Sequence, residues 1–151
     1  FYLFISKPDF MLKSMHVFVL LSSLFLISCQ RNNSADLTQT QVTATIQSGT
    51  WKVTLFNDNG IDETSNFNGF TFTFNGNGTA TATRNSTATN GSWVSGTDDS
   101  KVKLILDFGV TSPLDELNED WKVLERTDTR IKLTNVSGGN GETDFLTFEK
   151  M

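Results

Sequence analysis

The 151-residue chain has one cysteine, one histidine, one tyrosine and two prolines, and these scarcities exclude several classes of protein. A single cysteine cannot build a disulfide framework, and two prolines are too few for a collagen-like chain. Lys and Arg number 12 against 17 Asp and Glu, so the net charge is −5. A simple nucleic-acid binder needs a basic patch, so we expect no nucleic-acid partner. The length allows one domain.

The first thirty residues differ in composition from the rest of the chain. A short basic start at residues 11–13 precedes an apolar run over residues 17–27. These features are typical of a secretory signal peptide, and the run is shorter than the about 20 residues of a transmembrane helix. We therefore predict a signal peptide over 1–28, with 1–10 as an over-extended start. The alternative is a buried N-terminal helix.

A lipid anchor is predicted directly after this apolar run. The four residues LISC at 26–29 resemble a bacterial lipobox. The resemblance implies cleavage before Cys29 and lipid attachment to its sulfur, and two acyl chains anchor a protein stably to a membrane. The polar residues 29–35 would then form a lipidated tether to the domain over 36–151.

The residues after Cys29 bear on which membrane carries the anchor. Gln30 stands where an aspartate would signal retention in the inner membrane, so the known sorting rules imply the outer membrane. Surface-exported lipoproteins of the Bacteroidota often have acidic residues at this point. This chain has Arg31 there, which favours the periplasmic side.

Cleavage before Cys29 would also remove His16, the only histidine, and the anchor would consume the only thiol. Without them the chain cannot build a Ser-His-Asp triad, a Cys-His pair or a metal site that uses histidine. We therefore expect no enzyme, no catalytic residue, no metal and no cofactor.

From Gly49 onward, apolar and polar residues alternate with a period of two, which is typical of strands with one buried face. The clearest examples are Trp51/Val53/Leu55, Phe70/Phe72/Phe74 and Val102/Leu104/Leu106. The pattern predicts eight short strands. Turn-forming residues separate several of them, at 75–78, 90–91 and 137–141.

The connections are too short for helical crossovers, except at 109–120, so consecutive strands should be antiparallel neighbours. We predict an all-β fold, an eight-stranded antiparallel up-and-down β-barrel, with a two-sheet sandwich as the alternative. A short helix is expected within 36–48, where a loose strand is the alternative. A second is expected from Ser112, between strands five and six.

The segment GTW at 49–51 resembles the G-x-W signature of the lipocalins. The resemblance covers about residues 36–151 and is strongest to compact lipocalin-like lipoproteins of Bacteroidota. It implies that Trp51 closes the bottom of the barrel and that the barrel binds a small ligand. Thr127 and Asp128 match part of the T-D-Y motif of the family, with Thr129 in place of the tyrosine. The arginine of the last strand that stacks on the tryptophan is absent, and so is the C-terminal helix.

Longer and shorter connections alternate along the chain, which predicts one closed end and one end with a mouth. The longer set is 58–66, 85–90, 109–120 and 137–142. Most acidic residues fall there, including Asp58, Asp62, Glu63, Asp115, Glu116, Glu119 and Asp120. Such a rim attracts cationic partners, or Ca²⁺ weakly. The alternative is that the acid only keeps an anchored domain soluble.

Three function classes remain from the sequence. The first is a membrane-anchored module that binds a small ligand. The second is a structural or protein-interaction module of the outer membrane with a filled barrel. The third is a hydrolase that uses paired carboxylates of the fifth connection, and it ranks last. The sequence leaves the oligomeric state open.

The lipobox makes a direct prediction about the Cys29→Ser variant. Without the sulfur the precursor should stay unacylated and leave the detergent phase in phase partitioning, because the acyl chains supply the stable attachment. A variant that still sediments with membranes after a carbonate wash would contradict the anchor.

Overall fold

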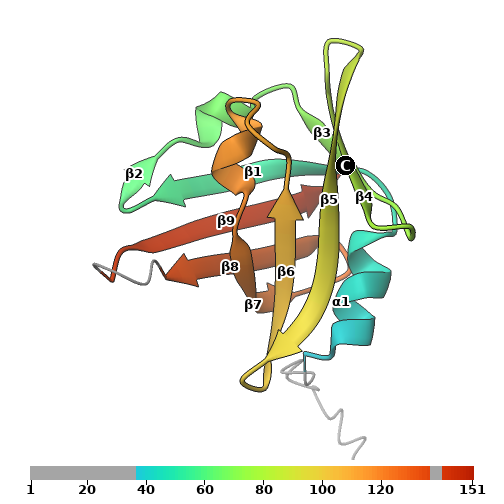
Figure 1. Cartoon of the computed structure of the whole chain (residues 1–151), viewed down its shortest axis with the longest axis vertical. Helices are drawn as coiled ribbons and strands as arrows, with labels where there is room; N and C mark the ends of the chain where they lie inside the picture. The colour runs from blue at the N-terminus through green and yellow to red at the C-terminus, as the bar shows by residue number, and fades with distance from the viewer. Residues whose placement is uncertain (1–36, 137–140) are drawn as a thin grey trace, which may run out of the picture. The chain divides into compact units, whose positions relative to one another are not determined.

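The computed structural model describes residues 37–136 and 141–151 (Figure 1). The predicted signal peptide, the tether and Cys29 lie outside these residues. The described part contains a helix, two 3-10 turns and nine strands, which are α1 (Gln39–Ile46), β1 (Trp51–Asp58), β2 (Ile61–Asp62), η1 (Thr64–Phe67), β3 (Thr71–Phe74), β4 (Thr79–Arg84), β5 (Thr87–Asp98), β6 (Lys101–Asp107), η2 (Leu114–Leu117), β7 (Asp120–Arg126), β8 (Arg130–Val136) and β9 (Thr143–Lys150).

The strands form a closed antiparallel barrel. From β3 to β9 each strand pairs with the next along the chain, and β9 pairs with β1 over Trp51–Lys150 to Asn57–Phe145. β1 also pairs with β3. The two-residue β2 pairs only with the C-terminal end of β1, at Asn57 and Asp58. The predicted eight-stranded up-and-down barrel is therefore confirmed, and β2 is an addition to it.

The barrel interior is filled by large apolar side chains. Alternate residues of the strands point inward and are at most 9% exposed. Phe72 and Phe74 of β3 lie with their ring centroids 5.4 and 5.6 Å from that of Phe148, at steep interplanar angles. Phe74 makes a similar edge contact with Trp93 at 5.8 Å. Edge-to-face pairs of this kind stabilise a core by about 0.5–1.5 kcal/mol each, beyond the burial of their surface.

The two ends of the barrel are built differently. We call one the helix end, which comprises α1, the turns at 75–78, 99–100 and 127–129, and Met151. We call the other the loop end, which comprises the turns at 59–60 and 85–86, η1, residues 108–119 with η2, and residues 141–142. Strand direction alternates in an antiparallel meander, so successive connections fall at opposite ends.

α1 confirms the helix expected within residues 36–48, and the strand alternative is wrong. Thr38 caps it, because its hydroxyl accepts from the backbone N–H of Gln41 while the Gln41 side chain accepts from the backbone of Thr38. This capping box satisfies N–H groups that a helix leaves without partners. Val42 and Ile46, one turn apart, are fully buried. Among the described residues no helix is long and apolar enough to cross a membrane.

One predicted connection, 85–90, is wrong. β4 and β5 are joined by Asn85 and Ser86 alone, with φ of 52° and 64°. Asn90 and Gly91, predicted to form a turn, lie inside β5. At this point β5 passes from its pairing with β4 to its pairing with β6, and a Cβ on Gly91 would collide with the carbonyl oxygen of Asp107. The glycine therefore permits close approach of two backbones rather than a turn.

The second predicted helix is shorter than expected. η2 is a single 3-10 turn, its N-cap position is Pro113, and no side chain caps it, so the predicted Ser112 cap is wrong. β7 begins three residues after η2, which leaves no room for further turns. Leu114 and Leu117 are fully buried, so this turn covers the barrel at the loop end.

The burial of Trp51 predicts a large loss of stability in Trp51→Ala. The side chain is fully buried, and truncating such an aromatic costs about 3–5 kcal/mol. Equilibrium unfolding in urea measures the loss. Val94→Ala is the matched control, because Val94 is 54% exposed and its truncation should change the free energy by no more than about 0.5 kcal/mol. A loss below about 1 kcal/mol for Trp51→Ala would contradict the burial of its side chain in the core.

Candidate functional site

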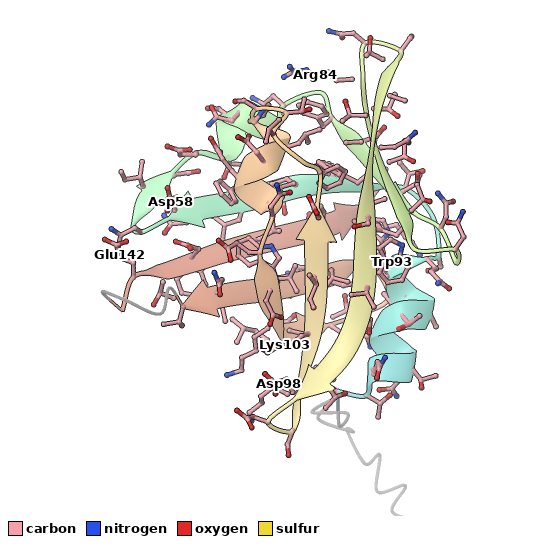
Figure 2. All side chains as sticks on the ribbon, in the orientation of Figure 1. Asp58, Arg84, Trp93, Asp98, Lys103 and Glu142 are labelled. Atoms are coloured by element: carbon pink, nitrogen blue, oxygen red, sulfur yellow. The ribbon has the colours of Figure 1, made fainter. Side chains whose placement is uncertain are left out.

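The loop end gathers several of the acidic residues predicted from the sequence. Asp58 is the last residue of β1, and Glu63 directly precedes η1. Asp115 and Glu116 lie in η2, on a different part of the chain. Figure 2 shows Asp58 and Glu142 on the same side of the barrel.

Asp58 is the centre of a first group of carboxylates. Desolvation by neighbouring atoms, followed by the charge of Asp144 and a hydrogen bond with it, raises the pKa of the exposed Asp58 above its ordinary value. Glu63 and Glu142 add to this shift in the same direction. Like charges held close together favour the protonated form, so this group stores mutual repulsion at neutral pH. The sequence analysis did not single out Asp144, because it lies inside a strand segment rather than in a loop.

Glu116 is the centre of a second group. Desolvation by neighbouring atoms, followed by the charges of Glu63 and Asp115, raises the pKa of the exposed Glu116. Glu63 thus faces both groups and joins them into one acidic surface. In the described part of the chain, no cluster of three or more acidic, histidine or cysteine side chains is arranged to hold a metal ion.

The other predicted acidic residues have separate roles. Asp62 accepts from the backbone N–H of Thr64 at 3.0 Å, and the hydroxyl and backbone of Thr64 lower its pKa. Asp120 bonds Lys103 Nζ at 2.8 Å on the barrel wall. Glu119 contributes its backbone carbonyl, which accepts from the N–H of Leu106 at 3.2 Å. The structure therefore does not join Asp62, Glu119 and Asp120 into the predicted acidic site.

A groove of about 290 Å³ opens at the loop end, between the β4–β5 hairpin and the segment before η2. Phe70 forms its floor, and the Arg84 guanidinium carbon lies 4.2 Å from the centroid of that ring. Thr87, Thr89 and Ser112 contribute hydroxyl groups. Figure 2 places Arg84 well away from Asp58 and Glu142. This groove is therefore chemically distinct from the acidic surface.

A second groove lies at the helix end. We call it the helix-end groove, and its volume is about 430 Å³. Its lining consists of Gln41, Ala44, Thr45, Ser48, Arg126, Asp128 and Lys150. Arg126 Nη1 donates to Thr45 Oγ1 at 2.7 Å, and Lys150 Nζ donates to Ser48 Oγ at 3.0 Å. Both strand cations are thus held against the last turn of α1 and the residues after it.

The sequence analysis missed the helix-end groove. Arg126 and Asp128 lie at the 127–129 turn, which the analysis had singled out only for its motif. Lys150 was not predicted as a site residue, although its Nζ lies 5.5 Å from the centroid of the Trp51 ring. A lysine of the last strand thus lies over this tryptophan.

Trp51 itself is fully buried at the helix end. Its indole Nε1 donates to the carbonyl oxygen of Ile46 at 2.8 Å, which satisfies one of the free carbonyls at the end of α1. The tryptophan therefore connects α1 to β1 and, through Lys150, to β9.

Comparisons with known proteins show a likeness to solved structures. No family model matches the chain, and no curated protein matches it. Among solved structures, a DUF4847 family protein from Bacteroides vulgatus ATCC 8482 is similar, with a TM-score of 0.48 and 18% sequence identity. The alignment covers 73% of this chain and 97% of that protein.

The acidic surface predicts opposite pH effects for two isosteric variants. The pKa of Asp58 is raised, so its ionisation disfavours the fold as pH rises through that pKa. Asp58→Asn should therefore be slightly more stable than the parent at pH near 7, by at most about 0.5 kcal/mol, and equal to it at pH near 3.

Asp62→Asn is the matched control, with the reverse sign. The pKa of Asp62 is lowered, so its contribution is present above the ordinary value of 3.8 and is lost as pH falls through the lowered pKa. This variant should be less stable than the parent near neutral pH, with the difference fading in acid. Urea unfolding at both pH values measures the two effects, and equal signs for the two variants would contradict the assignment.

Proposed function

We propose that this chain is a lipid-anchored envelope protein whose filled barrel acts through its outer surface rather than as a container. The lipobox at 26–29 supports an outer-membrane anchor on the periplasmic side. The packed interior is the observation that supports action through the outer surface. It favours the structural or protein-interaction module over a carrier of an enclosed small ligand.

The packing of side chains in the barrel interior supports this proposal. Pockets that enclose small molecules have volumes of about 300–1,000 Å³. Here the inward side chains of the strands are at most 9% exposed, and edge-to-face ring contacts connect them. Phe67 of η1 and Leu114 and Leu117 of η2 cover the same core at the loop end, each at most 2% exposed. An enclosed ligand would have to displace these side chains.

A small ligand on the rim is the second candidate. The groove at Arg84 is open, and at about 290 Å³ it lies just below the usual range for an enclosing pocket. A guanidinium stacked on Phe70 among hydroxyl groups suits a small polar molecule with a negative group. Such binding would use this groove at the loop end and leave the interior packed.

The proposal assigns no catalytic role to the chain. Four carboxylates of the fifth connection were considered from the sequence, Asp115, Glu116, Glu119 and Asp120. Glu116 of η2 faces the carboxylates of Glu63 and Asp115, and Asp120 is held by Lys103. A paired-carboxylate hydrolase needs its two acidic groups on either side of one scissile bond. The acidic surface supports a role in keeping the anchored domain soluble and in repelling anions.

Native mass spectrometry of the acylated protein, purified from membranes in a mild detergent, tests the proposal. We expect the mass of the chain from Cys29 plus its acyl groups, with no further bound molecule. Arg84→Ala is the matched variant for the second candidate. A co-purifying molecule that is lost in Arg84→Ala would assign it to the rim groove. A molecule retained in Arg84→Ala and also in Arg126→Gln, Lys150→Gln, which removes the cations of the helix-end groove, would overturn the filled barrel.

A further inference from the structure

We propose that the helix-end groove docks the phosphate of anionic phospholipid headgroups, so that the barrel stands with α1 against the membrane. This inference rests on the proposed lipid anchor and adds an orientation to it. The site consists of Arg126 and Lys150 together with the hydroxyl groups of Thr45 and Ser48.

The groove offers the groups that bind a phosphate. A guanidinium donates through several N–H groups in a fixed fork, and an ammonium adds a compact positive charge. Arg126 Nη1 uses one donor on Thr45 Oγ1, and Lys150 Nζ uses one donor on Ser48 Oγ. Each cation keeps further donors free, and the two hydroxyl groups hold both cations at the wall of the same groove.

The positive charge of the groove is poorly neutralised by the protein. The Arg126 side chain is 18% exposed, and its carboxylate partner within 4.0 Å is Asp128, at 3.4 Å and 97% exposed. Lys150 has no carboxylate within 4.0 Å in the described part of the chain. Other cations are occupied, since Arg130 and Lys132 both bond Glu125. An ion pair that water screens contributes little, so the groove stays open to an external anion.

The distribution of charged residues between the two ends of the barrel also bears on its orientation. The cations of the described residues are Lys52, Arg84, Lys101, Lys103, Lys122, Arg126, Arg130, Lys132 and Lys150. Of these, Arg84 alone lies at the loop end, where the acidic surface is found. In Figure 2, Arg84 and Lys103 lie toward opposite ends of the barrel. The helix end also carries Asp98, Asp99 and Asp128, so an anionic membrane repels the loop end more strongly than the helix end, and the attraction is confined to the cations of the groove.

The attachment of the tether brings the groove close to the membrane. Leu37 is the first described residue, and the helix that begins beside it supplies one wall of the groove. Leu37 lies eight positions after Cys29, and a fully extended chain of eight residues spans at most about 29 Å. Attraction of a basic group to an anionic leaflet acts over about one Debye length, so the tether lets the groove reach this range.

Reconstitution of the acylated protein into nanodiscs tests the proposal. One set contains phosphatidylcholine alone, and the other also contains phosphatidylglycerol. A fluorophore is placed on Thr129→Cys at the helix end or on Thr87→Cys at the loop end, and a headgroup-labelled lipid carries the quencher. We expect phosphatidylglycerol to increase quenching at residue 129 and not at residue 87. The increase should fade as the salt concentration rises.

Removal of the two cations should abolish this effect. The double variant Arg126→Gln, Lys150→Gln should lower the ratio of docked to undocked protein about thirtyfold, since each basic residue near an anionic surface contributes about fivefold. The matched control Arg84→Gln, Lys122→Gln loses the same charge outside the groove and should keep the quenching. If the double variant does not fold, Ala44→Glu puts a negative charge on the exposed lip of the groove, with Ala88→Glu as its control.

The outcomes separate this inference from the proposed function. Protein that fails to enter nanodiscs of either composition would overturn the anchor, and the docking with it. Protein that enters both, with equal quenching at residue 129 in both, would overturn the docking alone. Loss of quenching in the Arg84→Gln, Lys122→Gln control would also overturn it, because general charge and not the groove would then explain the effect.

Discussion

The contacts around Trp51 are the constraint on which the helix end depends. β1 and β3 pair at one position, Trp51 with Phe72, and toward the loop end the two strands diverge. The same tryptophan donates to Ile46 at the end of α1 and lies under Lys150 of β9. One residue therefore takes part in the pairing of β1 with β3 through its backbone, and through its buried side chain contacts the covering helix and a cation of the groove. Phe67 and Phe70 fill the space that the diverging strands leave toward the loop end.

The sequence predicted the barrel well because strand periodicity is a local signal. Residues such as Trp51, Val53 and Leu104 alternate with polar neighbours, and the inward residues are buried as expected. Turns were less predictable, because Gly91 has the composition of a turn but serves a close backbone approach that only the folded neighbours reveal. The length of η2 was unpredictable for a related reason, since the start of β7 limits it.

The candidate sites depended on contacts between distant segments, which a sequence pattern does not contain. The loops correctly pointed to the acidic side chains Asp58 and Glu116 at one end. Among the charges that raise the pKa of Asp58, that of Asp144 has the largest effect, and Asp144 lies more than 80 residues from Asp58 along the chain. Arg126 and Lys150 line the same groove because Thr45 of α1 and Ser48, just after the helix, accept hydrogen bonds from them. The separation of negative and positive charge between the two ends follows from the meander, which sends alternate connections to opposite ends.

The β4–β5 hairpin has a practical consequence for handling the protein. Figure 1 shows this hairpin rising beyond the rest of the loop end, and its tip consists of Asn85 and Ser86 alone. Both residues are exposed, and the flanking Arg84–Thr87 pair already lies outside the core. Chain added to a surface loop costs only about 0.6 kcal/mol for each doubling of loop length, and exposed tips tolerate such additions. An epitope inserted between Asn85 and Ser86 would thus display a label at the end of the barrel opposite α1 while the packed interior stays intact.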